Sequence, residues 1–209
     1  MTDRPILFTA SMVQALIAGR KRQTRRILKK QDWPEAVIRQ FPRQRDGVPF
    51  QPGDRLWVRE AWSVSLDYDP LAPSAIPTTA VIDYLANGLH HLAGKNRPSL
   101  FMPRWASRLT LVVTDVRVQR LQDISTEDAM SEGIVQTWGD WQGEPPPWAL
   151  RPGDNGTHCY DNRTSVENFR SLWESIHGSA SWESNPWVSA TAFATYHCNV
   201  DDPCLGGQS

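Results

Sequence analysis

The chain has 209 residues, 40% hydrophobic and 22% charged, which is ordinary for a globular protein with a sizeable core. No apolar run approaches the roughly 18 residues of a membrane-spanning helix, so we expect no membrane span. The net charge of −1 is uneven, because residues 1–45 carry +8 and the remainder carries −9. This distribution argues against a uniformly basic nucleic-acid binder and favours a localised site for phosphate or nucleic acid, with a solvated basic face as the alternative.

The cysteines and histidines predict neither a disulfide framework nor a metal site. Three cysteines at irregular spacing, without a CxxC pair and without a secretory signal before them, predict a reduced, cytoplasmic protein. The histidines and cysteines form adjacent pairs rather than metal-ligand spacings: His90-His91, His158-Cys159 and His197-Cys198. Walker and GxGxxG motifs are missing, so no nucleotide cofactor is expected either.

The N-terminal third predicts a strand, a short helix and a second extended segment. Residues 5–9 (PILFT) suit a strand, and Ser11 is placed to cap a helix that ends at Gly19. Residues 23–28 (QTRRIL) read as extended. Alternation then puts one set of side chains on one face (Thr24, Arg26, Leu28) and the other set opposite (Gln23, Arg25, Ile27).

The rest of the chain alternates strands, helices and loop insertions. Strands are predicted over residues 55–62, 78–86, 107–121 and 185–197. A short helix follows Ser125 and ends at Gly133, and an amphipathic helix covers residues 165–178. Insertions are expected at about 29–52, 67–78, 87–99 and 138–163, with a disordered tail at 198–209. Without regular βαβ alternation, the pattern favours an α+β fold with a small, partly closed β-barrel over a parallel doubly wound sheet.

The segment GRKRQTRR, residues 19–26, places five cations around Gln23 and Thr24. A threonine hydroxyl becomes a nucleophile when a base takes its proton, and a lysine among other cations loses its own proton more readily. Lys21 and Thr24 are therefore candidates for base and nucleophile, with Arg26 as a partner for an oxyanion or phosphate. The alternative is an exposed basic turn, and Arg22 and Arg25 fit solvated or phosphate-facing charge.

Glu132 is a second candidate because of its position. It stands in the last turn of its predicted short helix, where the helix dipole disfavours a negative charge. A carboxyl group in that environment suits general acid or base work. The alternative is an exposed glutamate without a function.

Four stretches together resemble the ASCH domain family, which has a PUA-like β-barrel. GRKRQTRR is similar to the family's G-x-K-x-x-T-x-R signature, and PGDRLWVRE (residues 52–60) resembles its turn into a barrel strand. VTDVRVQRLQDISTEDAMSEG (113–133) resembles its long strand and short helix ending in Glu-Gly, and NPWVSATAF (185–193) its closing strand. LWVREAW, MPRWASR and FRSLWESIHG add a likeness to phage and prophage members. The resemblance covers residues 5–196 and implies one domain over residues 1–197, carrying the four insertions.

The resemblance implies a metal-independent and cofactor-independent amidohydrolase that removes the acetyl group of N4-acetylcytidine. Carried over by motif, Lys21 activates Thr24, Thr24 attacks the amide carbonyl, and Glu132 handles the proton of the leaving amine. Other members are proposed as RNA-binding modules or nucleases. A non-catalytic RNA- or DNA-binding module and a metal-independent ribonuclease at the same site therefore stay open. The expected partner is a modified nucleoside or RNA or DNA, without a membrane, and the oligomeric state is left open.

The ten tryptophans and the proline-rich insertions suggest a lid or a stacking platform beside this site. We expect the pocket walls to include Trp57, Arg59, Glu60, Trp62, Arg104 and Trp105. For each of these tryptophans, packing in the core is at least as good an interpretation as stacking on a base.

Overall fold

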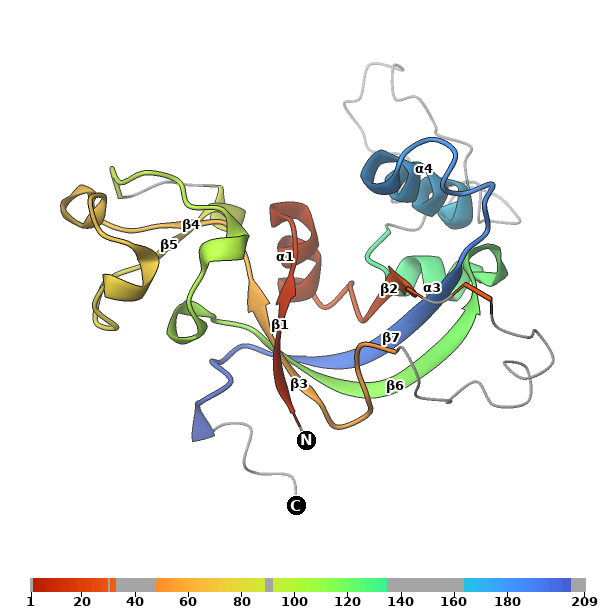
Figure 1. Ribbon diagram of the computed structural model, residues 1–209, viewed down its shortest axis with the longest axis horizontal. Coiled ribbons are helices and arrows are strands. Elements are labelled where there is room, and N and C mark those ends of the chain that lie inside the picture. Colours follow the sequence, from red (N-terminus) through yellow and green to blue (C-terminus); the bar gives the residue numbers. More distant parts are fainter. Residues whose placement is uncertain (1, 30, 33–47, 89–91, 135–163, 204–209) are drawn as a thin grey trace, which may run out of the picture.

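The computed structural model describes residues 2–29, 31–32, 48–88, 92–134 and 164–203. Its centre is one mixed sheet in the order β1-β3-β6-β7-β2. The strands are β1 (Asp3–Leu7), β2 (Gln23–Ile27), β3 (Arg55–Arg59), β6 (Thr110–Arg120) and β7 (Trp187–Tyr196). β1 pairs with β3 in parallel and every other neighbouring pair is antiparallel. The two long strands, β6 and β7, curve beneath β2 and the α-helices (Figure 1).

Three α-helices and a small strand pair complete the described elements. The helices are α1 (Ala10–Ile17), α3 (Thr126–Ser131) and α4 (Ser165–His177), and β4 (Trp62–Ser63) pairs with β5 (Asp83–Tyr84). In Figure 1, α1 stands beside β1, α3 and α4 lie at the opposite end near β2, and the β4–β5 pair projects away from the sheet. Short 3-10 turns lie at Leu66–Tyr68, Pro73–Ala75, Leu85–Asn87, Ser99–Phe101, Arg104–Ala106 and Leu121–Asp123.

The sheet confirms the expected α+β class but is not closed into a barrel by strand pairing. β1 and β2 are its two edges, and no backbone ladder joins them within the described residues. They meet instead through one side chain, because the Arg26 guanidinium donates a hydrogen bond of 3.1 Å to the Leu7 carbonyl oxygen. A cavity therefore lies between the two edges rather than a continuous ladder.

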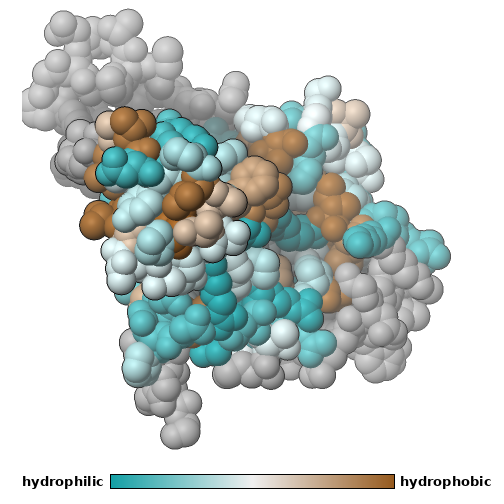
Figure 2. Space-filling view, turned by 60° about the vertical axis from the view of Figure 1, so that its left-hand side comes forward, coloured by the Kyte–Doolittle hydropathy of each residue, from teal (hydrophilic) through white to brown (hydrophobic). Residues whose placement is uncertain are grey.

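Each face of the sheet has its own core. One face packs against α1 around Val13, Leu16, Leu56 and Leu111, all fully buried. The other packs beneath α3 and α4 in a second cluster that includes Phe169. Six tryptophans lie in the described residues, and Trp105 alone among them is partly exposed. The other five are buried and fill the cores instead of offering stacking surfaces: Trp57, Trp62, Trp173, Trp182 and Trp187. Exposed large hydrophobic side chains occur in separate patches, as the face in Figure 2 illustrates.

Several predicted boundaries shift. The strand expected over 55–62 breaks at Glu60 and Ala61, because its end leaves the main sheet to pair as β4. Only Asp83–Tyr84 of the strand expected over 78–86 is extended. Thr9 rather than Ser11 is the N-cap of α1, and no side-chain hydrogen bond caps it. The whole expected insertion at 138–163, most of that at 29–52, part of that at 87–99, and residues 204–209 of the tail lie outside the described residues.

Candidate functional site

Local backbone geometry brings Lys21 and Glu132 together. Glu132 is the C-cap of α3, and the next residue, Gly133, has a φ of +97° that turns the chain back. Lys21 and Glu132 then form an isolated antiparallel β-bridge, and the Arg22 N–H donates to the Ser131 carbonyl at 2.7 Å. Glycine adopts this left-handed conformation without strain. The turn thus fixes a carboxylate against a lysine that lies 111 residues earlier in the chain.

The two side chains form a buried ion pair. Lys21 Nζ donates to Glu132 Oε2 at 2.9 Å and to the Glu132 carbonyl oxygen at 2.8 Å. The side chains are 2% and 5% exposed. Two of the three ammonium donors are therefore used, and the third has no partner among the described residues. Nζ also lies 5.6 Å from the centre of the Phe8 ring.

Arg25 corrects one sequence-based expectation, because it is neither solvated nor facing a phosphate. Its side chain is 0% exposed and donates to Glu132 Oε1 at 3.0 Å and to Asp128 Oδ2 at 2.6 Å. Arg117 donates to the second oxygen of Asp128 at 2.9 Å and to Gln23 at 2.8 Å. Burial raises the pKa of Asp128, but these two arginines outweigh it and hold that pKa below its ordinary value. The outer face of β2 is thus a network of charges in contact with α3.

Arg20 and Arg22 are exposed and do not surround the Lys21 ammonium. Arg20 donates to the Gly133 carbonyl at 3.3 Å and Arg22 to the Gly19 carbonyl at 3.0 Å. The charged group in contact with Nζ is Glu132 rather than any of the arginines that neighbour Lys21 in the sequence.

Thr24 lies on the opposite face of β2 and lines a cavity of about 330 Å³. The residue is 5% exposed and stands opposite Thr191 in the β2–β7 ladder. Its hydroxyl makes no hydrogen bond to Lys21, to Glu132 or to any other described residue, although Phe8 and Arg25, which contact the ion pair, share its cavity. The lining residues are Leu7, Phe8, Thr9, Ala10, Met12, Thr24, Arg25, Arg26, Ala61, Ser99, Ile176 and His177. Thr24 therefore does not bond to the ion pair, but shares a cavity with Phe8 and Arg25, which do contact it.

His177 is a member of this cavity that the sequence did not single out. It is the last residue of α4, and its ring centre lies 4.2 Å from that of Trp173. Burial and then the charge of Arg26 lower its pKa below 6.5. The imidazole is accordingly neutral at pH 7 and can accept a proton or a hydrogen bond there. The only sequence signal was a histidine before the helix-ending Gly178.

Arg26 lines the Thr24 cavity and also the cavity between the sheet edges. It is partly buried, and burial lowers the pKa of its guanidinium while the charge of Glu132 opposes that change. Its hydrogen bond to Leu7 holds the side chain between the two cavities. This position agrees with the expected role as an anion partner without testing it.

The remaining expected pocket walls do not line either of these two cavities. Trp57 is buried with the Arg59 guanidinium 5.2 Å from its ring centre, and Arg59 also donates to the Leu100 carbonyl. Trp62 is fully buried and packs in the core of the β4–β5 region, with Trp105 packed against the same cluster.

Glu60 and Arg104 serve as ion-pair residues of the scaffold. Glu60 accepts two hydrogen bonds of 2.9 Å from Arg108; burial raises the pKa of its carboxyl group and Arg108 limits that rise. Arg104 joins Asp3 in β1 to Asp201 near the C-terminal end, at 2.6 Å to each. These contacts tie distant segments together and give neither residue a free charge for a ligand.

The described residues contain no cluster of three or more metal-ligating side chains. The pairs His90-His91 and His158-Cys159 lie outside the described residues, as does Cys204. Cys198 is disulfide-bonded, which differs from the expectation of reduced cysteines. No described helix is long and apolar enough to cross a membrane.

Comparisons of the chain with protein-family models, with curated proteins and with solved structures found no match.

Proposed function

We propose that the protein is a metal-independent amidohydrolase acting on an N-acylated nucleobase such as N4-acetylcytidine, with a PUA-like ASCH fold. One observation carries the proposal: Thr24 lines a 330 Å³ cavity whose wall residues Phe8 and Arg25 contact the buried Lys21–Glu132 pair. The Thr24 hydroxyl, which has no hydrogen-bond partner among the described residues, thus faces a cavity two of whose wall residues contact a paired acid and base. The sequence resemblance to ASCH amidohydrolases names the same three residues.

In the proposed reaction Lys21 acts as the general base and Glu132 as the general acid. A proton passes from the Lys21 ammonium to the Glu132 carboxylate, over a contact of 2.9 Å, and leaves a neutral amine and a carboxylic acid. The amine takes the proton of Thr24 as its oxygen attacks the acyl carbon. Glu132 gives its proton to the departing nitrogen as the C–N bond breaks. These two transfers restore the Lys21–Glu132 ion pair. Water then hydrolyses the acyl-threonine ester, which releases a carboxylic acid and restores the Thr24 hydroxyl.

The cavity suits one small substrate better than a polymer. Its volume is near the lower end of the roughly 300–1,000 Å³ typical of small-molecule pockets. Apolar walls from Phe8, Met12 and Ile176 match a flat base and its acyl group, and Ser99 and His177 supply polar groups for its edges. Arg26 would stabilise negative charge on the acyl oxygen in the transition state.

The test is hydrolysis of N4-acetylcytidine and related N-acylated nucleosides by the pure protein, followed by chromatography of the free nucleoside. Thr24→Val removes the hydroxyl at nearly constant shape, and Lys21→Ala removes the base. Arg22→Gln is the matched control, because Arg22 belongs to the same basic segment but is exposed, and among the described residues its side chain bonds only to Gly19. Thermal unfolding first establishes that each variant is folded. Undiminished activity in folded Lys21→Ala would then refute the role of Lys21 as the base.

A second candidate is a non-catalytic RNA- or DNA-binding module, favoured by the exposed Arg20 and Arg22, neither of which forms an ion pair in the described residues. It predicts binding that weakens steeply with salt and a loss in Arg22→Gln at least as large as in Thr24→Val. The same basic segment would serve the ribonuclease alternative. Cleavage of a labelled RNA that persists in the presence of a metal chelator would favour that activity.

A further inference from the structure

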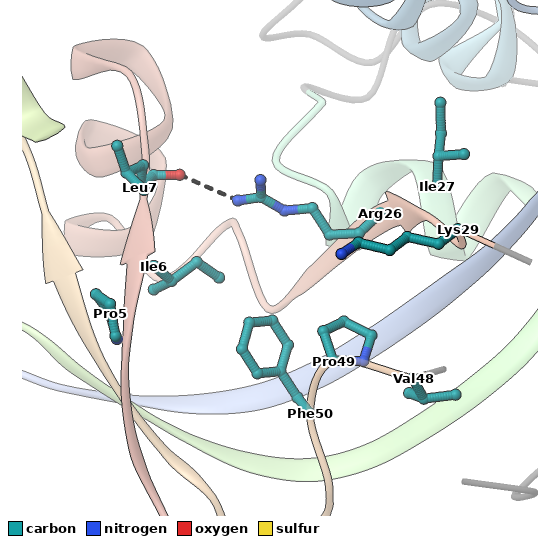
Figure 3. Close-up of a pocket in the computed structure, with 9 residues that line it drawn as sticks. All are labelled: Pro5, Ile6, Leu7, Arg26, Ile27, Lys29, Val48, Pro49 and Phe50. Carbon is teal, nitrogen blue, oxygen red and sulfur yellow. Dashed lines mark hydrogen bonds between the residues drawn. The ribbon is translucent and has the colours of Figure 1, made fainter. Parts of the chain in front are cut away.

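A second cavity lies between the two edges of the sheet, on the other side of Arg26 from Thr24. Its volume is about 500 Å³, within the range of small-molecule sites. β1 contributes Pro5, Ile6 and Leu7 to one wall, and Phe50 lies across from them in Figure 3. Arg26 and Lys29 extend from the β2 side. The incomplete closure of the sheet thus leaves a lined cavity of its own.

The cations of this cavity lack counter-charges. Within the described part of the chain, neither Arg26 nor Lys29 forms an ion pair, and no acidic residue lines the cavity. By contrast, Lys21 and Arg25 of the same segment are both paired with carboxylates. Arg26 uses one guanidinium nitrogen for Leu7, so its other N–H donors are open to a ligand. A partly buried guanidinium that has no ion-pair partner among the described residues would be stabilised by a bound anion.

The rest of the lining is apolar. Ile6 and Phe50 are 2% and 9% exposed, whereas Leu7 and Ile27 are 38% and 42% exposed on opposite sheet edges. Val48 and Pro49 continue this surface beside Phe50. A lining of mainly apolar residues favours a ligand with a hydrophobic body over a bare ion.

We propose that this cavity binds a small organic monocarboxylate with an apolar or aromatic body. The carboxylate pairs with the Arg26 guanidinium and the Lys29 ammonium, and the body packs on Phe50 and Ile6. A planar carboxylate can take two hydrogen bonds from a guanidinium, while the apolar walls disfavour a strongly hydrated ion such as inorganic phosphate. Arg26 lines both cavities, but the binding proposed here does not require hydrolysis, and of the two cavities Lys29 lines only this one.

The experiment is a titration of the full chain, labelled at isoleucine methyl groups, followed by NMR. Ile6 and Ile27 report on this cavity, and Ile176 reports on the Thr24 cavity. Benzoate and hexanoate are compared with benzyl alcohol and hexanol, which keep the bodies without the charge, and with inorganic phosphate, which keeps a charge without a body.

We expect the two carboxylates to shift the Ile6 and Ile27 methyl signals and to leave Ile176 unchanged. Lys29→Gln should weaken their binding about tenfold, as for the loss of a charge-assisted hydrogen bond, and Lys29→Arg should retain it. Arg22→Gln, an exposed arginine outside the cavity, should bind like the wild type. Equal binding of the alcohols, equal binding of phosphate, a response at Ile176 alone, or no response would each overturn the proposal.

Discussion

Replacement of Glu132 by glutamine should destabilise the fold strongly. Glu132→Gln keeps the side-chain shape but removes the only carboxylate that contacts Lys21 among the described residues. The Lys21 side chain is 2% exposed, so water cannot replace the lost charge. Arg25 is affected less, because it keeps Asp128 at 2.6 Å. Leaving one buried charge without its partner costs about 3–5 kcal/mol. Set against a total stability of about 5–15 kcal/mol, such a loss is a large share.

Two comparisons separate this effect from an ordinary surface change. Glu174→Gln breaks the exposed pair with Arg170, one helical turn apart in α4, and should cost less than about 1 kcal/mol. The double variant Lys21→Met/Glu132→Leu removes both charges. It should be much less destabilised than the sum of Lys21→Met and Glu132→Leu alone, because the two charges are removed together and Arg25 keeps Asp128.

The assay is urea unfolding followed by tryptophan fluorescence and circular dichroism, with ΔG from linear extrapolation. The prediction requires a lower midpoint at an unchanged m-value. A cost in Glu132→Gln below about 1 kcal/mol, or strictly additive single and double variants, would show that the pair behaves as an exposed one and would refute the reasoning.

Three further predictions concern the turn, the acid limb and the cavity. Gly133→Ala should cost about 1–3 kcal/mol in urea unfolding, because a Cβ there would lie 3.2 Å from that of Lys21 at a φ of +97°; Gly53→Ala, with open space at φ +88°, should cost less. The lowered pKa of Asp128 means that its stabilising contribution is present above its ordinary pKa and lost as pH falls through the folded value, so Asp128→Asn should flatten the decline in stability below about pH 4; an unchanged decline would contradict this. The His177 imidazole should titrate below pH 6.5 by NMR, and its pKa should rise in Arg26→Gln. An unchanged pKa in Arg26→Gln would show that the Arg26 charge does not act on the imidazole.

Local patterns predicted the elements that local chemistry determines. The alternation of residues 107–121 and the apolar face of residues 165–178 correspond to β6 and α4 with small shifts at the ends. Alternation also placed Thr24 and Arg25 on opposite faces of β2. Alternation does not show what covers each face. A sequence pattern alone therefore favours a solvated Arg25, whereas α3 covers it in the structure.

Contacts between distant residues could not be derived from spacing. The approach of Glu132 to Lys21 depends on the whole sheet and on the turn at Gly133, and only the family resemblance pointed to it. The strand expected over 55–62 breaks at Glu60 and Ala61 because Trp62 and Ser63 pair with Asp83 and Tyr84, about 20 residues later, instead of continuing in the main sheet. His177 was missed for the same reason, since its neighbours in the cavity, Thr24 and Arg26, come from the other end of the chain.

The most direct test of the proposed site is the rate of acyl hydrolysis in wild type and Thr24→Val, measured side by side on N4-acetylcytidine under single-turnover conditions. The loss of the nucleophile should reduce the rate by about a thousandfold or more, with unfolding by urea unchanged within about 1 kcal/mol. Equal rates in the two proteins, or a wild type that hydrolyses no N-acylated nucleoside, would contradict the claim that Thr24 and the Lys21–Glu132 pair form a reaction site.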